Sequence, residues 1–140
     1  MQFKAQTLAL LLSTLPFTIA TAQDTASTQD TLKPRSWDLR LLRPGCVSDG
    51  ANFDISVYHS SGVSERSCVD LTAVTGLNLS VIDTVSWKSP SEPSFDLCMY
   101  RNGDCDAEGL VGAIRSGWGV CVSYEKWKGW RAVAKGEECD

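Results

Sequence analysis

Six cysteines are the residues of this chain whose chemistry is easiest to infer from their number and spacing. They are Cys46, Cys68, Cys98, Cys105, Cys121 and Cys139. An even number of thiols in a short exported chain is typical of a disulfide framework, and zinc binding is disfavoured because no Cys-x2-Cys pair occurs. We therefore expect three intramolecular disulfides, no free thiol and no cysteine nucleophile.

Spacing favours one pairing of these cysteines without excluding the others. The favoured pairs are Cys98–Cys105, Cys46–Cys139 and Cys68–Cys121. The first pair flanks a short turn, so the two side chains can meet if the hairpin is tight. The second pair brackets the domain and would join its ends, and the third is the pair that then remains.

The chain offers few residues for catalysis or for binding a metal. His59 is the only histidine, it follows an alternating run that indicates a turn, and no Gly-x-Ser-x-Gly nucleophile motif occurs. Asp104, Asp106 and Glu108 form the densest acidic cluster, but they lack the EF-hand pattern, which favours a solvated loop. We expect a protein that is not an enzyme and that uses no metal and no cofactor.

Aromatic and basic side chains gather near the end of the chain and indicate a binding surface. The candidate binding residues are Trp118, Tyr124, Trp127, Trp130, Lys128 and Arg131, with Lys126 beside them. Tryptophan, tyrosine and arginine are the usual anchors of binding surfaces because they offer large and rigid contact area. The alternative is that the tryptophans fill the core of this part of the domain. As a second surface feature, Asn78-Leu79-Ser80 is an N-glycosylation sequon, whose occupancy requires exposure during export.

The N-terminal part of the chain is typical of an exported protein. Residues 1–22 combine Lys4, a short apolar run and the small residues Ala20 and Ala22, as in a signal peptide cleaved after Ala22. Residues 23–43 are expected to form a flexible Ser/Thr-rich tail whose hydroxyls are candidate sites for O-linked sugars. This tail is either a pro-segment that is cut after Arg35 or an ordinary linker with a solvated arginine. Arg40-Leu41-Leu42-Arg43 also matches the Arg-x-Leu-Arg motif of oomycete effectors, and we interpret this match as coincidence.

Composition narrows the choice of partners. The 13 basic residues are outnumbered by 17 acidic ones, and one of the basic residues, Lys4, lies in the signal segment. This balance disfavours nucleic acid as a partner, because phosphate binding needs clustered Lys and Arg. No apolar stretch is long enough to span a membrane. We expect residues 44–140 to form one disulfide-rich domain, secreted as a monomer.

Alternation of apolar and polar residues predicts an all-β domain. It occurs in Phe53–Tyr58, Leu77–Val81, Phe95–Tyr100 and Val120–Tyr124, each bounded by turn residues. The glycine-flanked segment Leu110–Ile114 is too short for a helix. Strands of this length and spacing favour a sandwich or a barrel.

Two segments of the domain are similar to one another. Phe53–Tyr58 matches Phe95–Tyr100, and Cys68–Leu71 matches Cys121–Tyr124. Continuing the second match pairs Val74 with Trp127, Gly76 with Gly129 and Leu77 with Trp130. A repeat of this kind suggests two related units packed on each other, although two β-rich halves can also be alike by chance.

The repeat resembles the Greek-key unit of the βγ-crystallin superfamily. The hairpin Cys98–Cys105, with Gly109 after it, is similar to one found in small secreted fungal proteins of that fold, which include antimicrobial and killer-toxin-like members. The resemblance implies two Greek-key units packed as a small disulfide-stapled β-sandwich of about eight strands, with Tyr58 and Tyr100 equivalent. The calcium pattern of that superfamily is missing, so calcium binding is not expected.

Export, disulfides and the aromatic cluster together favour a secreted interaction protein. We expect an effector-like module with a role in virulence, or a toxin-like or antimicrobial one, that binds a host or microbial protein or glycan. The alternatives are a structural or protective protein of the cell surface or wall, and a protease inhibitor that presents a disulfide-braced loop at 86–94.

Overall fold

The computed structural model describes residues 36–140, which form eight strands and three short 3-10 helices. The strands are β1 (Trp37–Leu42), β2 (Ser56–Gly62), β3 (Arg66–Asp70), β4 (Thr84–Lys88), β5 (Phe95–Tyr100), β6 (Leu110–Ile114), β7 (Trp118–Ser123) and β8 (Gly129–Ala134). The 3-10 helices are η2 (Leu71–Ala73), η3 (Leu79–Val81) and η4 (Ala107–Gly109). The expected signal peptide and the expected cut after Arg35 lie outside the described residues. Within residues 36–140, no helix has the length and apolar character needed to cross a membrane.

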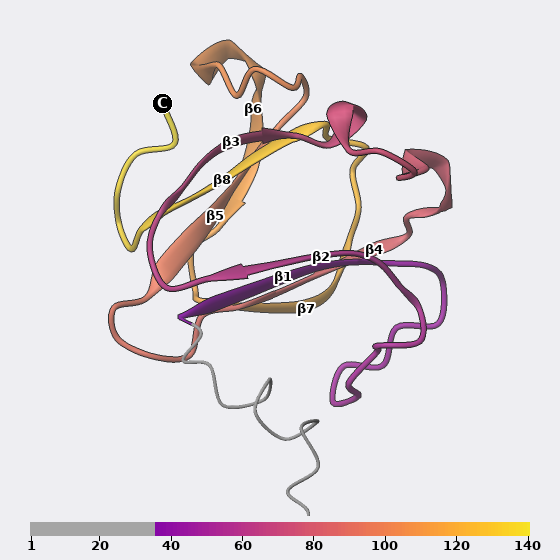
Figure 1. Ribbon diagram of the computed structural model, residues 1–140. Helices are drawn as coiled ribbons and strands as arrows, with labels where there is room; N and C mark the ends of the chain where they lie inside the picture. The colour runs from indigo at the N-terminus through magenta and orange to yellow at the C-terminus, as the bar shows by residue number, and fades with distance from the viewer. Residues whose placement is uncertain (1–35) are drawn as a thin grey trace, which may run out of the picture. The chain divides into compact units, whose positions relative to one another are not determined.

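The strands form two antiparallel four-stranded sheets that face each other (Figure 1). Sheet A has the order β2-β1-β4-β7, and sheet B has the order β3-β8-β5-β6. In each half of the chain the fourth strand returns to lie beside the first, which is the Greek-key arrangement. The third strand of each half crosses to the other sheet, so β3 completes sheet B and β7 completes sheet A. The prediction of two Greek-key units packed as a small disulfide-stapled β-sandwich is therefore confirmed.

The pairing registers show which strands of the two halves are equivalent. The β1–β2 ladder shifts register between Leu41 and Leu42, and the β5–β6 ladder shifts between Met99 and Tyr100. Strand β1 therefore corresponds to β5, and Trp37-Asp38-Leu39 corresponds to Phe95-Asp96-Leu97. The predicted match of Phe53–Tyr58 to Phe95–Tyr100 is wrong, because it aligns the start of β2 with β5.

The second part of the predicted repeat is partly right. Cys68 in β3 and Cys121 in β7 lie at equivalent register shifts, opposite β8 and β4. The predicted continuation of this match beyond β3 and β7 is wrong, because the residue equivalent to Trp130 is Val85 in β4 and not Leu77. The expected equivalence of Tyr58 and Tyr100 is also wrong, since Tyr58 pairs with Leu41 of β1 while Tyr100 lies in β5 itself.

The predicted tail 23–43 overlaps the domain, and this boundary is corrected. Its last part is β1, the strand between β2 and β4 in sheet A, and Leu39, Leu41 and Leu42 in it are fully buried. The sequence Trp-Asp-Leu-Arg-Leu alternates with the period of a strand, so one face of it enters the core. The first three residues of the Arg-x-Leu-Arg motif at 40–43 thus belong to a paired strand, and both of its leucines are buried.

The core lies between the sheets and is centred on aromatic rings from both. Trp37 stacks on Trp87, with ring centroids 5.6 Å apart, and meets Trp130 of sheet B edge to face at 5.8 Å. Tyr58 also packs edge to face against Trp130. Burying a large apolar side chain contributes about 1.5–3 kcal/mol, so this cluster is a main source of sheet-to-sheet cohesion.

The predicted strands agree with the observed ones to different extents. Phe95–Tyr100 is β5, and Val120–Tyr124 overlaps β7. Leu110–Ile114 is the strand β6, while Phe53–Tyr58 reaches only the start of β2. Leu77–Val81 is not a strand, because Asn78 caps the 3-10 helix η3 with its side chain.

All six cysteines are paired, as expected, but each predicted pairing is wrong. The bridges are Cys46–Cys121, Cys68–Cys105 and Cys98–Cys139, each with a Cα–Cα distance of 5.7 Å. The side chains of β5 alternate, so Cys98 and Tyr100 lie on the outer side of sheet B and pack with the C-terminal segment. The hydroxyl of Tyr100 donates to the carbonyl of Cys139 at 2.6 Å. Because Cys98 lies on this face, it bonds to Cys139 in the C-terminal segment. Cys105 bonds instead to Cys68 in β3.

Candidate functional site

The predicted aromatic binding patch is wrong for its central residues. Trp127 and Trp130 are 2% and 0% exposed and belong to the core. Trp118 on β7 is 53% exposed, and Tyr124 is half-buried with its ring against Trp127. The alternative that the tryptophans fill the core therefore holds for two of the three, because β8 lies inside sheet B with one face toward sheet A.

The basic residues of the predicted patch are also separated. Lys126 and Lys128 lie beside Tyr124 at a groove next to η3. Arg131 lies on the outer side of sheet B and donates to the backbone carbonyl of Asp140. The predicted residues therefore divide among a face of sheet A, the groove and a face of sheet B, and they do not form one surface.

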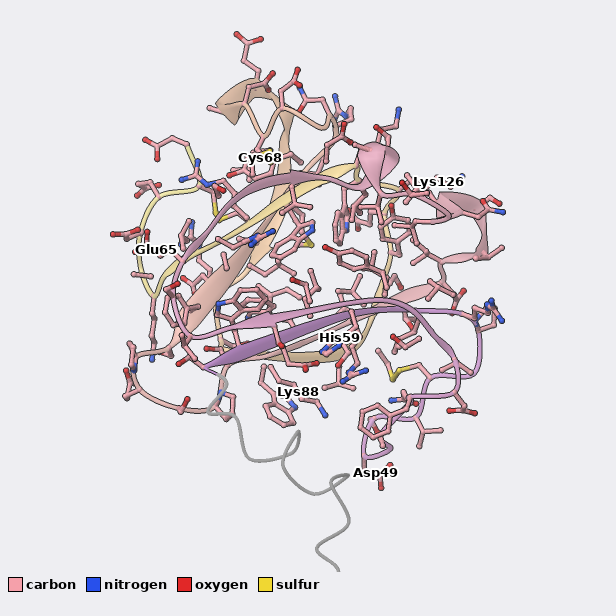
Figure 2. The ribbon with its side chains drawn as sticks, in the orientation of Figure 1. Asp49, His59, Glu65, Cys68, Lys88 and Lys126 are labelled. Atoms are coloured by element: carbon pink, nitrogen blue, oxygen red, sulfur yellow. A yellow bond between two sulfur atoms is a disulfide. The ribbon has the colours of Figure 1, made fainter. Side chains whose placement is uncertain are left out.

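A different set of residues gathers on the outer face of sheet A. It consists of Asp38, Arg40, His59 and Lys88 with the rings of Phe53 and Trp118, and we call these six residues the charged face. Strand pairing positions all of them except Phe53, since Arg40 lies opposite His59, Asp38 opposite Lys88, and Lys88 opposite Trp118. Phe53 lies in the loop before β2 and contacts Arg40. Figure 2 shows His59 and Lys88 on the side of sheet A that is turned away from sheet B.

A carboxylate organises the polar part of the charged face. Asp38 Oδ2 lies 2.7 Å from His59 Nε2, and Asp38 Oδ1 lies 3.0 Å from Arg40 Nε. The His59 tautomer that carries its proton on Nε2 donates a hydrogen bond to Asp38. In this tautomer Nε2 has no lone pair, so it cannot accept a hydrogen bond from Arg40 Nη2, which lies 3.3 Å away. The three side chains thus form a fixed and nearly charge-balanced cluster at the surface.

Two exposed aromatic rings flank this cluster, each with a cation against it. The Arg40 guanidinium lies 4.6 Å from the ring centroid of Phe53, and Lys88 Nζ lies 5.0 Å from that of Trp118. Phe53 is 67% exposed, the highest value among the large apolar side chains of residues 36–140. A cation over an exposed ring contributes about 0.5–1 kcal/mol, which helps to hold the rings in place.

The charged face borders an open hollow of about 500 Å³. Asp38, Arg40, Phe53 and Lys88 line it together with Asp49 and Pro90 from neighbouring loops, and Figure 2 shows Asp49 in the loop that follows β1. Two acidic and two basic side chains therefore line the hollow. The lining of the hollow therefore offers hydrogen-bond donors and acceptors without a strong net charge.

Sequence reasoning missed the charged face for identifiable causes. Asp38 and Arg40 fell within the predicted tail, and His59 was expected in a turn, whereas it lies inside β2. The alternation of Trp-Asp-Leu-Arg-Leu was the signal that could have revealed a half-buried strand at 37–41. Phe53 was expected to begin a strand, but it precedes β2 in an exposed loop.

The groove next to η3 is smaller and more apolar. About 300 Å³ is enclosed by Leu79, Ser80, Ile82, Tyr124, Lys126 and Lys128, and we call it the η3 groove. The Tyr124 hydroxyl donates to the carbonyl of Trp127, and burial raises the pKa of Tyr124 to about 12. Tyr124 is therefore a neutral, fixed wall of the groove at physiological pH.

The acidic cluster at 104–108 has a local structural role. Asp106 Oδ1 accepts from the backbone N–H of Gly109 at 2.7 Å, and its Oδ2 accepts from Asn102 Nδ2 at 2.7 Å, which caps η4. Among residues 36–140, no three His, Cys, Asp or Glu side chains are arranged to hold a metal ion.

Comparison with known proteins gives no relative for this chain. No family model matches it, and no curated protein and no solved structure matches it either.

Proposed function

We propose that this chain is an exported interaction protein that binds a target outside the producing cell through the charged face, and that it acts by binding rather than by catalysis. The observation that carries the proposal is the pair of exposed rings, Phe53 and Trp118, on either side of a fixed Asp38–Arg40–His59 cluster. Aromatic and arginine side chains are enriched among residues that dominate binding energy. Three disulfides support an extracellular location.

A glycan is the target class that fits this surface best. The lining of the hollow is balanced between Asp38 and Asp49 on one side and Arg40 and Lys88 on the other, so it favours an uncharged ligand rich in hydroxyl groups. Fixed carboxylate and guanidinium groups can accept from and donate to hydroxyls, and flat ring faces can pack on the C–H faces of sugars. Within this proposal the protein is effector-like or antimicrobial according to whether the glycan belongs to a host or to a competitor.

The protease-inhibitor alternative is less well supported than a binding role of the charged face. The loop at 86–94 was expected to be braced by a disulfide, but Ser86 to Lys88 belong to β4 and the rest contains no cysteine. Ser89 is buried, and its hydroxyl bonds to the backbone of Phe95 and Ser36. The structural or protective wall protein remains the competing proposal, because it would use the same scaffold.

The relation to the βγ-crystallin superfamily stays a proposal. It is supported by the hairpin motif Cys98–Cys105 and by the Greek-key arrangement of both halves. Tyr58 and Tyr100 are not equivalent, so part of what the resemblance implied does not hold here.

A pull-down on insoluble polysaccharides tests the proposal directly. The secreted chain is incubated with chitin, β-glucan and cellulose, and we expect it to be retained by at least one of them. Trp118→Ala and Phe53→Ala should each weaken retention, by roughly thirtyfold if the ring is central, since such truncations cost about 2 kcal/mol. Val63→Ala is the matched control, because Val63 is 57% exposed and lies outside the charged face.

The outcomes separate the candidate functions. Binding of both aromatic variants, Trp118→Ala and Phe53→Ala, like the wild type would remove the charged face from consideration. Applying the protein to plant tissue and to competing microbes distinguishes the effector-like from the antimicrobial form, whereas inertness in both with retention in the wall would favour the structural protein. Loss of activity in His59→Asn alone, with Trp118→Ala unaffected, would point to catalysis.

A further inference from the structure

Asn78 is an exposed residue in a turn whose side-chain hydrogen bonds are made by its amide oxygen. It is the N-cap of η3, and its Oδ1 accepts from Ser80 N at 3.0 Å and from Ser80 Oγ at 2.7 Å. Both Asn78 and Ser80 are exposed. Both hydrogen bonds use the amide oxygen, so the turn does not depend on Nδ2.

An equivalent turn at Asp70 supports this point. Asp70 Oδ1 accepts from Thr72 N at 2.8 Å and from Thr72 Oγ1 at 2.7 Å, and Asp70 caps η2 in the same way. This turn forms around a carboxylate that has no amide nitrogen. The asparagine at position 78 is therefore not required by the local structure, which leaves its Nδ2 available for chemistry.

The η3 groove begins at this sequon. Leu79 and Ser80 belong both to the sequon and to the wall of the groove, whose other walls are Ile82, Tyr124 and the lysines 126 and 128. Leu79 and Tyr124 supply apolar surface, and the two lysines supply N–H donors at the rim. That combination fits the first sugars of a chain attached at the groove's edge, because each pyranose has apolar C–H faces and a rim of hydroxyls.

We propose that Asn78 carries an N-linked glycan and that the innermost sugars of this glycan lie in the η3 groove. The proposal rests on export, which is part of the proposed function. In the transfer, Asn78 Nδ2 gives up one proton to a base of the exporting cell's transferase and forms a bond to the anomeric carbon of an N-acetylglucosamine. The bond from that carbon to a diphosphate oxygen of a lipid-linked oligosaccharide breaks, and the lipid diphosphate leaves. Nothing is oxidised or reduced.

Intact mass is the first test. The full chain is expressed in a eukaryotic secretion host, collected from the medium and weighed before and after treatment with peptide N-glycosidase. We expect the wild type and Ser80→Thr to lose a glycan mass on treatment, whereas Asn78→Asp and Ser80→Ala should not change. Asn78→Asp is the matched control, because it retains the oxygen that caps η3 as Asp70 does for η2.

The outcomes of this first test distinguish glycosylation from export. Secreted wild-type protein that loses no mass on treatment would overturn the glycan while leaving export and the charged face intact. Protein kept inside the cell without a glycan would overturn both, because the transferase acts only in the export compartment.

Amide hydrogen exchange tests where the sugars lie. The glycosylated protein is compared with the enzymatically deglycosylated protein, in which residue 78 becomes aspartate, and with the Asn78→Asp variant. We expect the segments around Leu79–Ile82 and Tyr124–Lys128 to exchange several-fold faster in both glycan-free forms, with no change in β5. Equal exchange in all three forms would show a glycan that points away from the groove and would overturn that half of the proposal.

Discussion

At the scale of single residues, two tryptophans close in sequence have opposite environments. Trp130 is fully buried among Trp37 and Tyr58, whereas Trp118 stands on the outside of sheet A with Lys88 against its ring. We expect Trp130→Ala to lower the free energy of unfolding by about 3–5 kcal/mol through cavity formation, and Trp118→Ala to lower it by no more than about 1 kcal/mol, the contribution of the lost contact with Lys88. Urea denaturation of both variants measures the difference. Similar losses in the two would contradict the burial described here.

Tyr124 gives a prediction for alkaline pH. Burial raises its pKa from 10.0 to about 12, so the folded state holds the phenol proton more tightly than the unfolded state. This group's contribution to stability is therefore complete below pH 10 and is lost as the pH rises from 10 toward 12. We expect the pH dependence of unfolding in this window to be weaker in Tyr124→Phe. An unchanged dependence would mean that other groups cause it.

Asp70 gives the corresponding prediction at acid pH. Hydrogen bonds from the side chain and backbone of Thr72 lower the pKa of Asp70 below 3.8, because they favour the charged carboxylate. The stabilisation by Asp70 is present above the ordinary pKa and is lost as the pH falls through the lowered one. Thr72→Val, which keeps the backbone donor and removes the hydroxyl, should move the pKa back toward 3.8. An NMR titration of the Asp70 carboxyl carbon follows this shift, and no shift would exclude the hydroxyl as the main cause.

At the scale of elements, β1 decides where the domain begins. It pairs with both β2 and β4 in sheet A and supplies Trp37, Leu39 and Leu41 to the core. A chain that starts at Ser36 should therefore fold, as after a cut following Arg35, whereas one that starts at Pro44 should not. Circular dichroism and oxidised yield compare the two truncated chains. A folded chain that starts at Pro44 would show that sheet A tolerates the loss of β1.

The elements also show what the sequence can and cannot specify. β5 was predicted with its full bounds because its apolar alternation lies between clear turn residues. Leu77–Val81 has the same alternation, but the Asn78 side chain offers a local alternative to pairing, and the chain takes a 3-10 turn there. The charged face could not be predicted, because it depends on the register that places β1 between β2 and β4, and no short-range pattern encodes that register.

At the scale of the whole molecule, the disulfides follow the packing of the two halves. Cys46–Cys121 and Cys68–Cys105 each join the first half of the chain to the second, and Cys98–Cys139 ties the C-terminal segment to sheet B. The sequence predicted that all thiols are paired but not which pairs form, because the partners depend on which face of a strand each cysteine occupies.

Peptide mapping without reduction checks this connectivity. We expect three cross-linked peptide pairs. Removal of either bridge between the halves should lower the free energy of unfolding by roughly 2–4 kcal/mol, because the unfolded chain gains conformational entropy. Cys46→Ala/Cys121→Ala is the informative double variant, because it leaves no unpaired thiol. A peptide containing Cys98 bonded to Cys105 would contradict the structure.

The exchange of β3 and β7 between the sheets has a consequence for proteolysis. The halves are joined by the exposed loop Pro90–Pro93, between β4 and β5, which a protease can reach. A single cut there would leave each half holding a strand of the other's sheet and two disulfides across the gap. We expect the clipped protein to remain one particle and to separate into fragments only after reduction and denaturation together. A clipped two-chain form would thus keep both four-stranded sheets and the bridges between them.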